Sequence, residues 1–297
     1  MSEFLQQLIN GISLGAIYAL IALGYTMVYG VLRFINFAHS DVLMIGAYVG
    51  VFASPYFPKN SFAGGLGIML AAMAGCAALG IIIEKLAYRP LRNSSTLNVL
   101  ITAIGVSLLL ENGAQLMWSA RSRPFPAIFP GHSIHVAGIV ISTSQIAVLV
   151  ISIALLGMLQ WIVLRTRIGT AMRAVSFNPA AASLVGINND VVISFTFGLG
   201  SALAGAGGIL YSLNYPSVDP YMGIMPGLKA FVAAVLGGIG NIPGAALGGL
   251  IIGVIETFVG GSQKYSTWRD AIAFAILILI LLVRPTGLLG KAQTEKV

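Results

Sequence analysis

Long stretches without a charged residue dominate this sequence and limit what it can fold into. The stretches longer than 20 residues that contain no Asp, Glu, Lys or Arg are 4–32, 60–83, 124–164, 191–218 and 230–255. A helix needs roughly 20 consecutive apolar residues to cross a membrane. Since each of these stretches reaches that length, the chain is expected to cross a membrane several times.

Composition excludes the soluble classes of protein. Hydrophobic residues make up 57% of the chain and charged residues 8%, whereas a soluble domain carries about 25% charged residues. A soluble domain of this size must cover its surface with polar groups. This excludes a soluble enzyme and a disordered chain. It also excludes a nucleic-acid partner, although the net charge is +7.

The fold class that follows is all-α: a polytopic integral membrane protein of eight or nine segments, forming one transmembrane domain over residues 1–297. The two short segments, 41–57 and 226–240, are candidates for broken or re-entrant helices, which a membrane tolerates only where protein covers the backbone. Eight crossings would place the first residue inside and nine would place it outside, and the sequence leaves both open. The expected segments are 5–30, 41–57, 62–84, 95–118, 137–164, 190–212, 226–240, 244–262 and 267–284.

Positive charge predicts the orientation, because Lys and Arg gather on the cytoplasmic side of membrane proteins. They cluster at 85–92, at 165–173 and in the tail at 284–296. These three regions, and with them the C-terminus, are expected to face the cytoplasm. The loops at 120–136 and 213–221 are then expected outside.

Glycine pairs spaced four residues apart predict close helix packing. The pairs are Gly11 and Gly15, Gly244 and Gly248, and Gly249 and Gly253. Small residues at this spacing let helix backbones approach each other in lipid. We expect contacts within the chain, with a subunit interface as the alternative.

Motifs for chemistry are absent from the sequence. It contains no Gly-x-x-x-x-Gly-Lys-Ser/Thr phosphate loop, and its three His and one Cys form no metal-binding pattern. We therefore expect no catalytic residues, no metal site and no cofactor. An intramembrane enzyme is the weakest of the functions considered.

The polar stretch at 165–187 is too hydrophilic to cross a membrane, and its sequence predicts two short helices. The first is expected over 167–175. Asn178 followed by Pro179 is typical of the beginning of a second helix, and Gly186 is typical of its end. Apolar side chains exposed on such a loop would suit docking to a partner; they are Ala181, Ala182, Leu184 and Val185.

This loop resembles a known coupling loop. Ala180-Ala-Ala-x-x-x-Gly186 is similar to the Glu-Ala-Ala-x-x-x-Gly loop of ABC importer permeases, with Ala180 in place of the acidic residue. The wider string from Arg173 to Gly186 resembles the branched-chain amino-acid permease family. Three further stretches resemble that family: 36–48, 237–256 and 284–290. Within the first, Ser40 stands where the family commonly has Gly.

The resemblance covers nearly the whole chain, whose length is similar to the smaller permease of the leucine/isoleucine/valine importer. It implies a permease subunit of an ATP-binding-cassette importer in the bacterial inner membrane, with the path for branched-chain or related amino acids partly formed by this chain. It also implies a second permease, two subunits that hydrolyse ATP and an external solute-binding protein. The coupling residues it implies are Arg173, Ala174, Asn178, Pro179, Ala181, Ala182 and Gly186.

The alternative function is a self-sufficient secondary transporter or channel for small polar solutes, which would need no loop for an ATPase. Polar residues within or beside the membrane segments are candidates for the transport path under either function, because such residues are costly there unless they face a cavity or a partner. The alternative for each is a hydrogen bond between helices or a place at the membrane interface. The candidates are Asn36, His39, Glu111 and Glu256.

Overall fold

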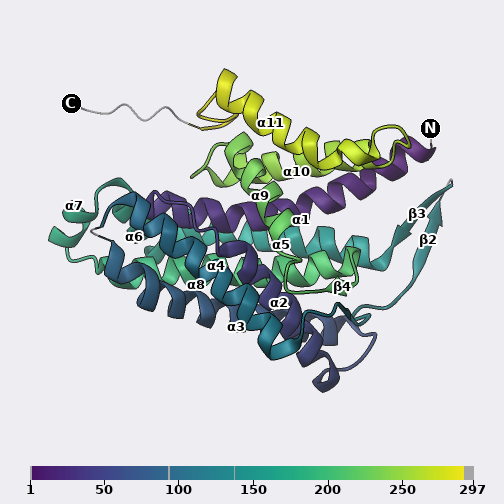
Figure 1. Ribbon diagram of the computed structural model, residues 1–297, viewed down its shortest axis with the longest axis horizontal. Coiled ribbons are helices and arrows are strands. Elements are labelled where there is room, and N and C mark those ends of the chain that lie inside the picture. The colour runs from purple at the N-terminus through teal and green to yellow at the C-terminus, as the bar shows by residue number, and fades with distance from the viewer. Residues whose placement is uncertain (1, 93, 137, 291–297) are drawn as a thin grey trace.

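A computed structural model of the protein describes residues 2–92, 94–136 and 138–290 (Figure 1). Each segment expected from the sequence forms a helix in it, which confirms the all-α polytopic class. Two shorter helices, α6 (Arg167–Phe177) and α7 (Pro179–Leu184), lie between α5 and α8. The expected segments correspond to α1 (Ser2–Leu32), α2 (His39–Ala53), α3 (Phe62–Ile83), α4 (Thr96–Trp118), α5 (Thr143–Arg165), α8 (Asn189–Asn214), α9 (Ile224–Gly237), α10 (Ile242–Gly260) and α11 (Arg269–Val283).

Short strands join the helices on one side of the molecule. β1 (Arg123–Pro124) pairs with β4 (Ser217–Val218), and β2 (Ser133–Val136) pairs with β3 (Ile139–Ser142), both antiparallel. The expected beginning of the segment at 137–164 was therefore wrong, because β3 occupies 139–142 and α5 begins at Thr143. The side chain of Ser142 accepts from the Gln145 amide, and the Gln145 side chain accepts in return from the Ser142 amide. This capping box fixes the beginning of α5.

Helices α2 and α9 are each too short to span a membrane alone. Among the described residues, seven helical stretches are long and apolar enough to cross one, the last being α11 together with the short helical turn before it (Ser266–Val283). By contrast, α2 has 15 residues and α9 has 14. At about 1.5 Å per residue, each extends roughly 22 Å, less than the roughly 30 Å of the hydrocarbon core. Both fit the broken helices expected at these positions.

The helices run between two ends of the bundle. Figure 1 shows α6 and α7 at one end, which we call the loop end, and the β2–β3 hairpin at the other, which we call the hairpin end. Gln6, near the beginning of α1, donates to the Val140 carbonyl of β3 (2.9 Å), whereas Gly30, near the end of α1, accepts from Ser176 of α6. Successive helices alternate in direction. The first described residues thus lie at the end opposite α6 and α7.

The short helices α2 and α9 begin next to each other inside the bundle. A Cβ on Gly227 of α9 would lie 2.3 Å from the Cβ of Ser40, and one on Gly223 would lie 2.2 Å from the Ser40 carbonyl oxygen. From this meeting point, α2 runs toward the hairpin end and α9 toward the loop end (Figure 1). The close contact is present although Ser40 is not glycine, because the glycines lie on the opposing segment.

Glycines of α1 and α10 bring these two backbones into direct contact. A Cβ on Gly253 would lie 2.2 Å from the Gly15 Cα, and one on Gly249 would lie 2.4 Å from the Ala19 nitrogen. Helix α1 is almost entirely enclosed, since 94% of its most apolar stretch is buried. The pairs Gly11/Gly15 and Gly249/Gly253 therefore pack within the chain.

Replacing Gly253 by leucine is expected to destabilise the bundle by about 3 kcal/mol or more, the upper part of the range for overpacked cores, because backbone atoms rather than flexible side chains block the new group. The measurement is the midpoint of thermal unfolding in detergent. Gly105→Leu on α4 is the matched control, since no atom lies within 4 Å of a Cβ placed at that residue. Equal midpoints for the two variants would contradict this account of the packing.

Candidate coupling loop and transport path

The helices α6 and α7 form as the sequence pattern predicts. The Thr166 side chain accepts from the Gly169 amide at the beginning of α6, and the Asn178 side chain accepts from the Ala181 amide at the beginning of α7 (3.0 Å). Pro179 occupies the first position of α7. Gly186 follows the end of α7 with a φ of +86°, a left-handed conformation that favours glycine.

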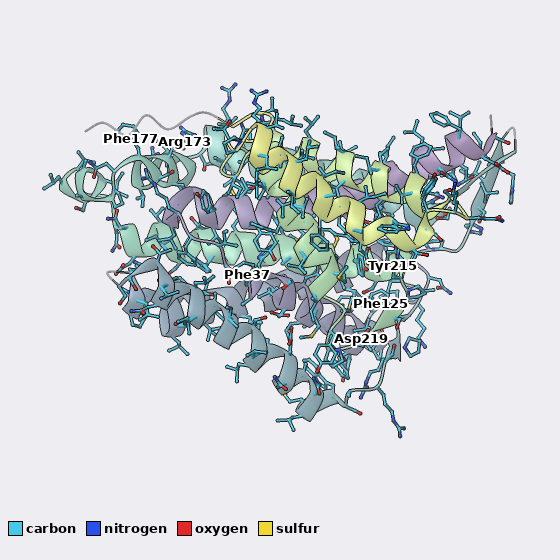
Figure 2. The ribbon with its side chains drawn as sticks, turned by 45° about the horizontal axis from the view of Figure 1, so that its top comes forward. Phe37, Phe125, Arg173, Phe177, Tyr215 and Asp219 are labelled. Carbon is cyan, nitrogen blue, oxygen red and sulfur yellow. The ribbon has the colours of Figure 1, made fainter. Side chains whose placement is uncertain are left out.

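The exposed apolar surface of this loop differs in part from the expectation. Leu184 and Phe177 are each 88% exposed and Val185 is 77% exposed. Ala182, which the sequence placed on this surface, is buried at 3% exposure. It faces inward because the turn at Gly186 brings the Ile187 amide back to the Ala182 carbonyl (3.1 Å). Phe177, the last residue of α6, is exposed instead, and Figure 2 shows it at the loop end near Arg173.

Contacts with three other helices hold the loop in position. Arg173 donates to the Val163 carbonyl of α5 and to the Thr170 hydroxyl, and Ser176 donates to the Gly30 carbonyl of α1. Asn189 of α8 donates to the Pro179 carbonyl (2.9 Å). Ala174 is half-buried against the core. Arg173 and Ala174 thus anchor the loop, and Ala181 lies exposed on it.

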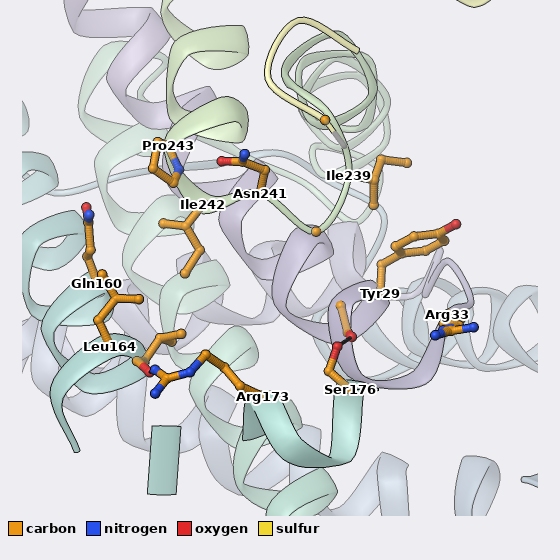
Figure 3. Close-up of a pocket in the computed structure, with 14 residues that line it drawn as sticks. Tyr29, Arg33, Gln160, Leu164, Arg173, Ser176, Ile239, Asn241, Ile242 and Pro243 are labelled. Atoms are coloured by element: carbon orange, nitrogen blue, oxygen red, sulfur yellow. Dashed lines mark hydrogen bonds between the residues drawn. The ribbon is translucent and has the colours of Figure 1, made fainter. Parts of the chain in front are cut away.

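A cavity of about 470 Å³ lies behind α6, between the ends of α1 and α5 and the α9–α10 connection (Figure 3). Arg33 and Arg173 lie on opposite sides of it, and Asn241 lies across from them. Asn241 caps α10 and also donates to the Leu289 carbonyl (2.7 Å). The cavity therefore separates α6 from the α9–α10 connection, while α6 itself contacts α1 and α5.

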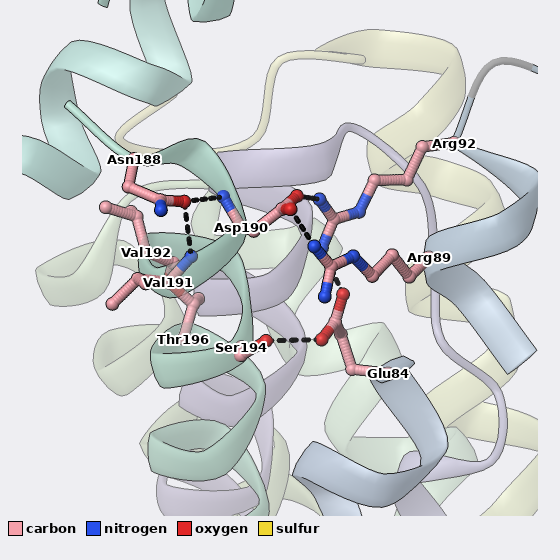
Figure 4. Close-up of polar contacts among 9 residues, drawn as sticks. All are labelled: Glu84, Arg89, Arg92, Asn188, Asp190, Val191, Val192, Ser194 and Thr196. Atoms are coloured by element: carbon pink, nitrogen blue, oxygen red, sulfur yellow. Dashed lines mark hydrogen bonds and ion pairs between the residues drawn. The ribbon is translucent and has the colours of Figure 1, made fainter. Parts of the chain in front are cut away.

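An ion-pair network that the sequence did not reveal joins the segment after α3, residues 84–92, to α8 beside the loop (Figure 4). Asp190 accepts from both Arg89 and Arg92, and Arg92 also pairs with Glu84. Glu84 is fully buried and accepts in addition from Ser194 of α8. Arg89 and Arg92 lie about 100 residues before Asp190 in the sequence, so no local spacing could have indicated the network.

The candidate path residues lie in two places, around the beginning of α2 and on α10. Asn36 is buried before α2 and accepts from the Tyr88 hydroxyl (2.6 Å). His39, the first residue of α2, packs edge-on against Tyr25 with 4.8 Å between ring centroids. Its Nε2 is buried and has no hydrogen-bond partner among the described residues.

Glu111 lies on α4 near a second carboxylate that no sequence pattern had marked. Asp41 of α2 is 1% exposed and accepts from the Ser107 hydroxyl of α4 (2.5 Å). Ser107 precedes Glu111 by about one helical turn. The structure thus gathers Asp41, Ser107 and Glu111 where α2 begins.

Glu256 lies apart from the others, among charges from neighbouring helices. It accepts from Lys229 of α9 (2.7 Å) and from the Tyr18 hydroxyl of α1 (2.9 Å). Lys229 also pairs with Asp270 (2.7 Å), and the Arg269 Nε lies 3.5 Å from Glu256. These contacts favour the alternative role stated for Glu256, a polar contact between helices.

Comparisons with known proteins cover nearly the whole chain. The family described as "Branched-chain amino acid transport system / permease component" matches residues 7–281. The chain is 43% identical to the high-affinity branched-chain amino acid transport system permease protein BraD of Pseudomonas aeruginosa, over 99% of this chain and 98% of that protein. It shows the same identity and coverage with the permease protein LivH of Escherichia coli. It is 28% identical to a probable LivH of Methanocaldococcus jannaschii, over 91% of this chain and 88% of that protein.

Proposed function

This chain belongs to the family of branched-chain amino acid transport permeases, and from that premise we propose that it is a membrane-spanning permease subunit of an ATP-driven importer. Its solute is a branched-chain or closely related amino acid. The observation that carries the proposal is the match of 43% identity over nearly the full length of both chains to permeases named for that transport. The anchored loop of α6 and α7, with apolar side chains exposed at its tip, supports the coupling role.

ATP hydrolysis takes place on two separate subunits in this proposal. Each would grip a short helix outside the membrane and pass on its own closure by rigid-body contact. Leu184, Phe177 and Val185 supply the apolar surface for that contact, because large apolar side chains exposed in a cluster mark interaction sites. A second permease would complete the transport path, and a solute-binding protein would deliver the amino acid from outside.

The loop end faces the cytoplasm in this proposal, and the C-terminus with it. Eight of the described Lys and Arg residues lie at the loop end and five at the hairpin end, which agrees with the preference of positive charge for the cytoplasmic side. Two further tail residues counted in the sequence, Lys291 and Lys296, lie outside the described residues. The protein is a multi-pass membrane protein; its place in the bacterial inner membrane is part of the proposal.

Cysteine labelling is expected to confirm this orientation. Ser122 and Ser217 are exposed, and their hydroxyls lie 2.5 Å apart at the hairpin end, where β1 meets β4. Cysteine at either position, in a Cys76→Ser background, is expected to react with an impermeant thiol reagent added outside intact cells. Cysteine at Ser94, which is exposed at the loop end, is expected to react only after the membrane is opened. The reverse pattern would place α6 and α7 outside and remove them as an ATPase contact.

Co-purification tests the function itself. The tagged chain is expected to bring with it two ATP-binding subunits and a second permease, and leucine with its binding protein is expected to stimulate ATP hydrolysis by the assembly. Uptake of a polar solute by the chain alone in liposomes, driven by an ion gradient, would instead establish the secondary transporter.

A further inference from the structure

A polar cavity of about 450 Å³ lies at the hairpin end, apart from the coupling loop. Helices α1, α5, α8, α10 and α11 form its walls. Tyr215, labelled in Figure 2, lies at its rim after α8. The volume falls within the range of about 300–1,000 Å³ typical of small-molecule sites. Polar side chains predominate among the lining residues, which is unusual for a space between membrane helices.

One stripe of α1 presents hydrogen-bond donors to this cavity. Gln7, Asn10 and Ser13 line it at intervals of three residues, which places them on the same face of a helix. The Ser13 hydroxyl is buried and has no partner among the described residues. Asn10 Oδ1 already accepts from Gln6 (3.1 Å) and Gln145 (2.7 Å), which leaves the amide NH₂ group of Asn10 for another acceptor.

Opposite charges lie on the other side of the cavity. Glu256 and Arg269 both line it, with the Arg269 Nε 3.5 Å from Glu256 Oε1. Among the described residues, the terminal nitrogens of Arg269 make no hydrogen bond, and the side chain is 43% exposed. Both oxygens of Glu256 already accept hydrogen bonds, Oε1 from Lys229 and Oε2 from the Tyr18 hydroxyl. The guanidinium is therefore the charged group left to bind a ligand.

We propose that this cavity binds the carboxylate of an amino acid as it enters from the exterior. Arg269, Ser13 and the Asn10 amide supply the donors for that carboxylate. Leu14 is the one apolar side chain on the α1 wall of the cavity, so the site recognises the part that all amino acids share rather than the side chain. The inference rests on the proposed function for its solute and for the outward direction of the hairpin end.

Direct binding of radiolabelled leucine to the assembled importer tests this inference. The importer is placed in phosphatidylcholine nanodiscs, which contain no lipid carboxylate, and the solute-binding protein is left out. Leucine is expected to bind, and leucinamide, which lacks the carboxylate, is expected not to compete. Arg269→Gln is expected to weaken binding roughly tenfold or more, the effect of losing one charge-assisted hydrogen bond. Arg121→Gln, an exposed arginine at the same end, is the matched control and is expected to bind like the wild type.

A second readout keeps the test decisive if Arg269→Gln does not assemble. Ser13→Ala removes one donor without adding volume and is expected to weaken leucine binding severalfold. Cysteine at Thr257, which lines the cavity, is expected to be protected from a thiol reagent by leucine but not by leucinamide. Unchanged binding in both variants, equal competition by leucinamide, or labelling insensitive to leucine would each overturn the inference. Failure of the proposed function would appear differently, as a wild-type chain that recruits no ATPase.

Discussion

Leu184→Asp is expected to abolish uptake while leaving the membrane-spanning bundle folded. Leu184 is 88% exposed at the tip of α7 and contributes little to the stability of the chain itself. An aspartate there would carry an unpaired charge into the proposed apolar contact with the ATPase, where burial of an unpaired charge is strongly unfavourable. The measurements are ATPase recovery with the tagged chain and leucine uptake, and both are expected to fall at least tenfold, equivalent to about 1.4 kcal/mol or more of lost association.

Two controls separate docking from charge and from folding. Ser94→Asp adds the same charge to another exposed loop at the loop end and is expected to keep uptake near normal. Leu184→Met keeps an apolar side chain and is expected to keep most of the activity. Normal ATPase recovery with Leu184→Asp would refute the assignment of this surface. Ala182→Asp is not an equivalent probe, because Ala182 is buried within the loop and the charge would disrupt the loop directly.

Substitution of Gly186 provides a second test of ATPase docking. No atom lies within 4 Å of a Cβ placed there, so the conformation with φ of +86°, and not a lack of space, requires glycine. Gly186→Val is expected to distort the turn and reduce ATPase recovery, because β-branched residues adopt this conformation at high cost. Gly186→Asn is the matched control and is expected to be tolerated, since asparagine adopts the left-handed conformation more readily.

Lys229→Met is expected to give the largest loss of stability among the charged residues. Its side chain is 5% exposed and pairs with Glu256 and Asp270. Removing one partner of a buried ion pair costs about 3–5 kcal/mol, because the other charge is left uncompensated. The Tyr18 hydroxyl and Arg269 remain near Glu256, so the lower part of that range is expected. The measurement is the unfolding midpoint of the purified assembly.

The double variant Lys229→Met/Glu256→Met is expected to recover part of that stability, because it removes the stranded carboxylate together with its partner. Lys264→Met, an exposed lysine before α11, is the matched control and is expected to unfold like the wild type. If the double variant were no more stable than Lys229→Met, the charge on Glu256 would not be the cause of the loss.

Local patterns in the sequence were sufficient to predict the helices and the two short helices of the loop at 165–187. Runs without charge marked the membrane segments, because lipid requires them to be apolar over a helical length. Asn178, Pro179 and Gly186 marked the ends of α7, since capping depends on neighbouring backbone groups. The burial of Ala182 could not be predicted in this way, because it depends on how the turn at Gly186 folds back.

Contacts between distant segments account for what the sequence did not reveal. Lys229, Glu256 and Asp270 come from three helices, and their pairing depends on how α9 lies against α10 and α11. The lengths of α2 and α9 indicated broken helices, but nothing local indicated that the two begin against each other at Ser40. The roles proposed for the loop residues in ATPase binding and for the polar residues in transport are predictions, which the experiments above test.

The enclosure of α1 has a consequence for how the protein is made. Its glycine-lined face is matched by α10, which begins about 210 residues later in the chain. At roughly 5–20 residues per second, ribosomes take about 10–40 seconds to reach that helix. During this interval the glycine-lined face of α1 lies in the bilayer without α10 packed against it. Nascent chains that stall before residue 242 are therefore expected to be preferred substrates of membrane quality-control proteases.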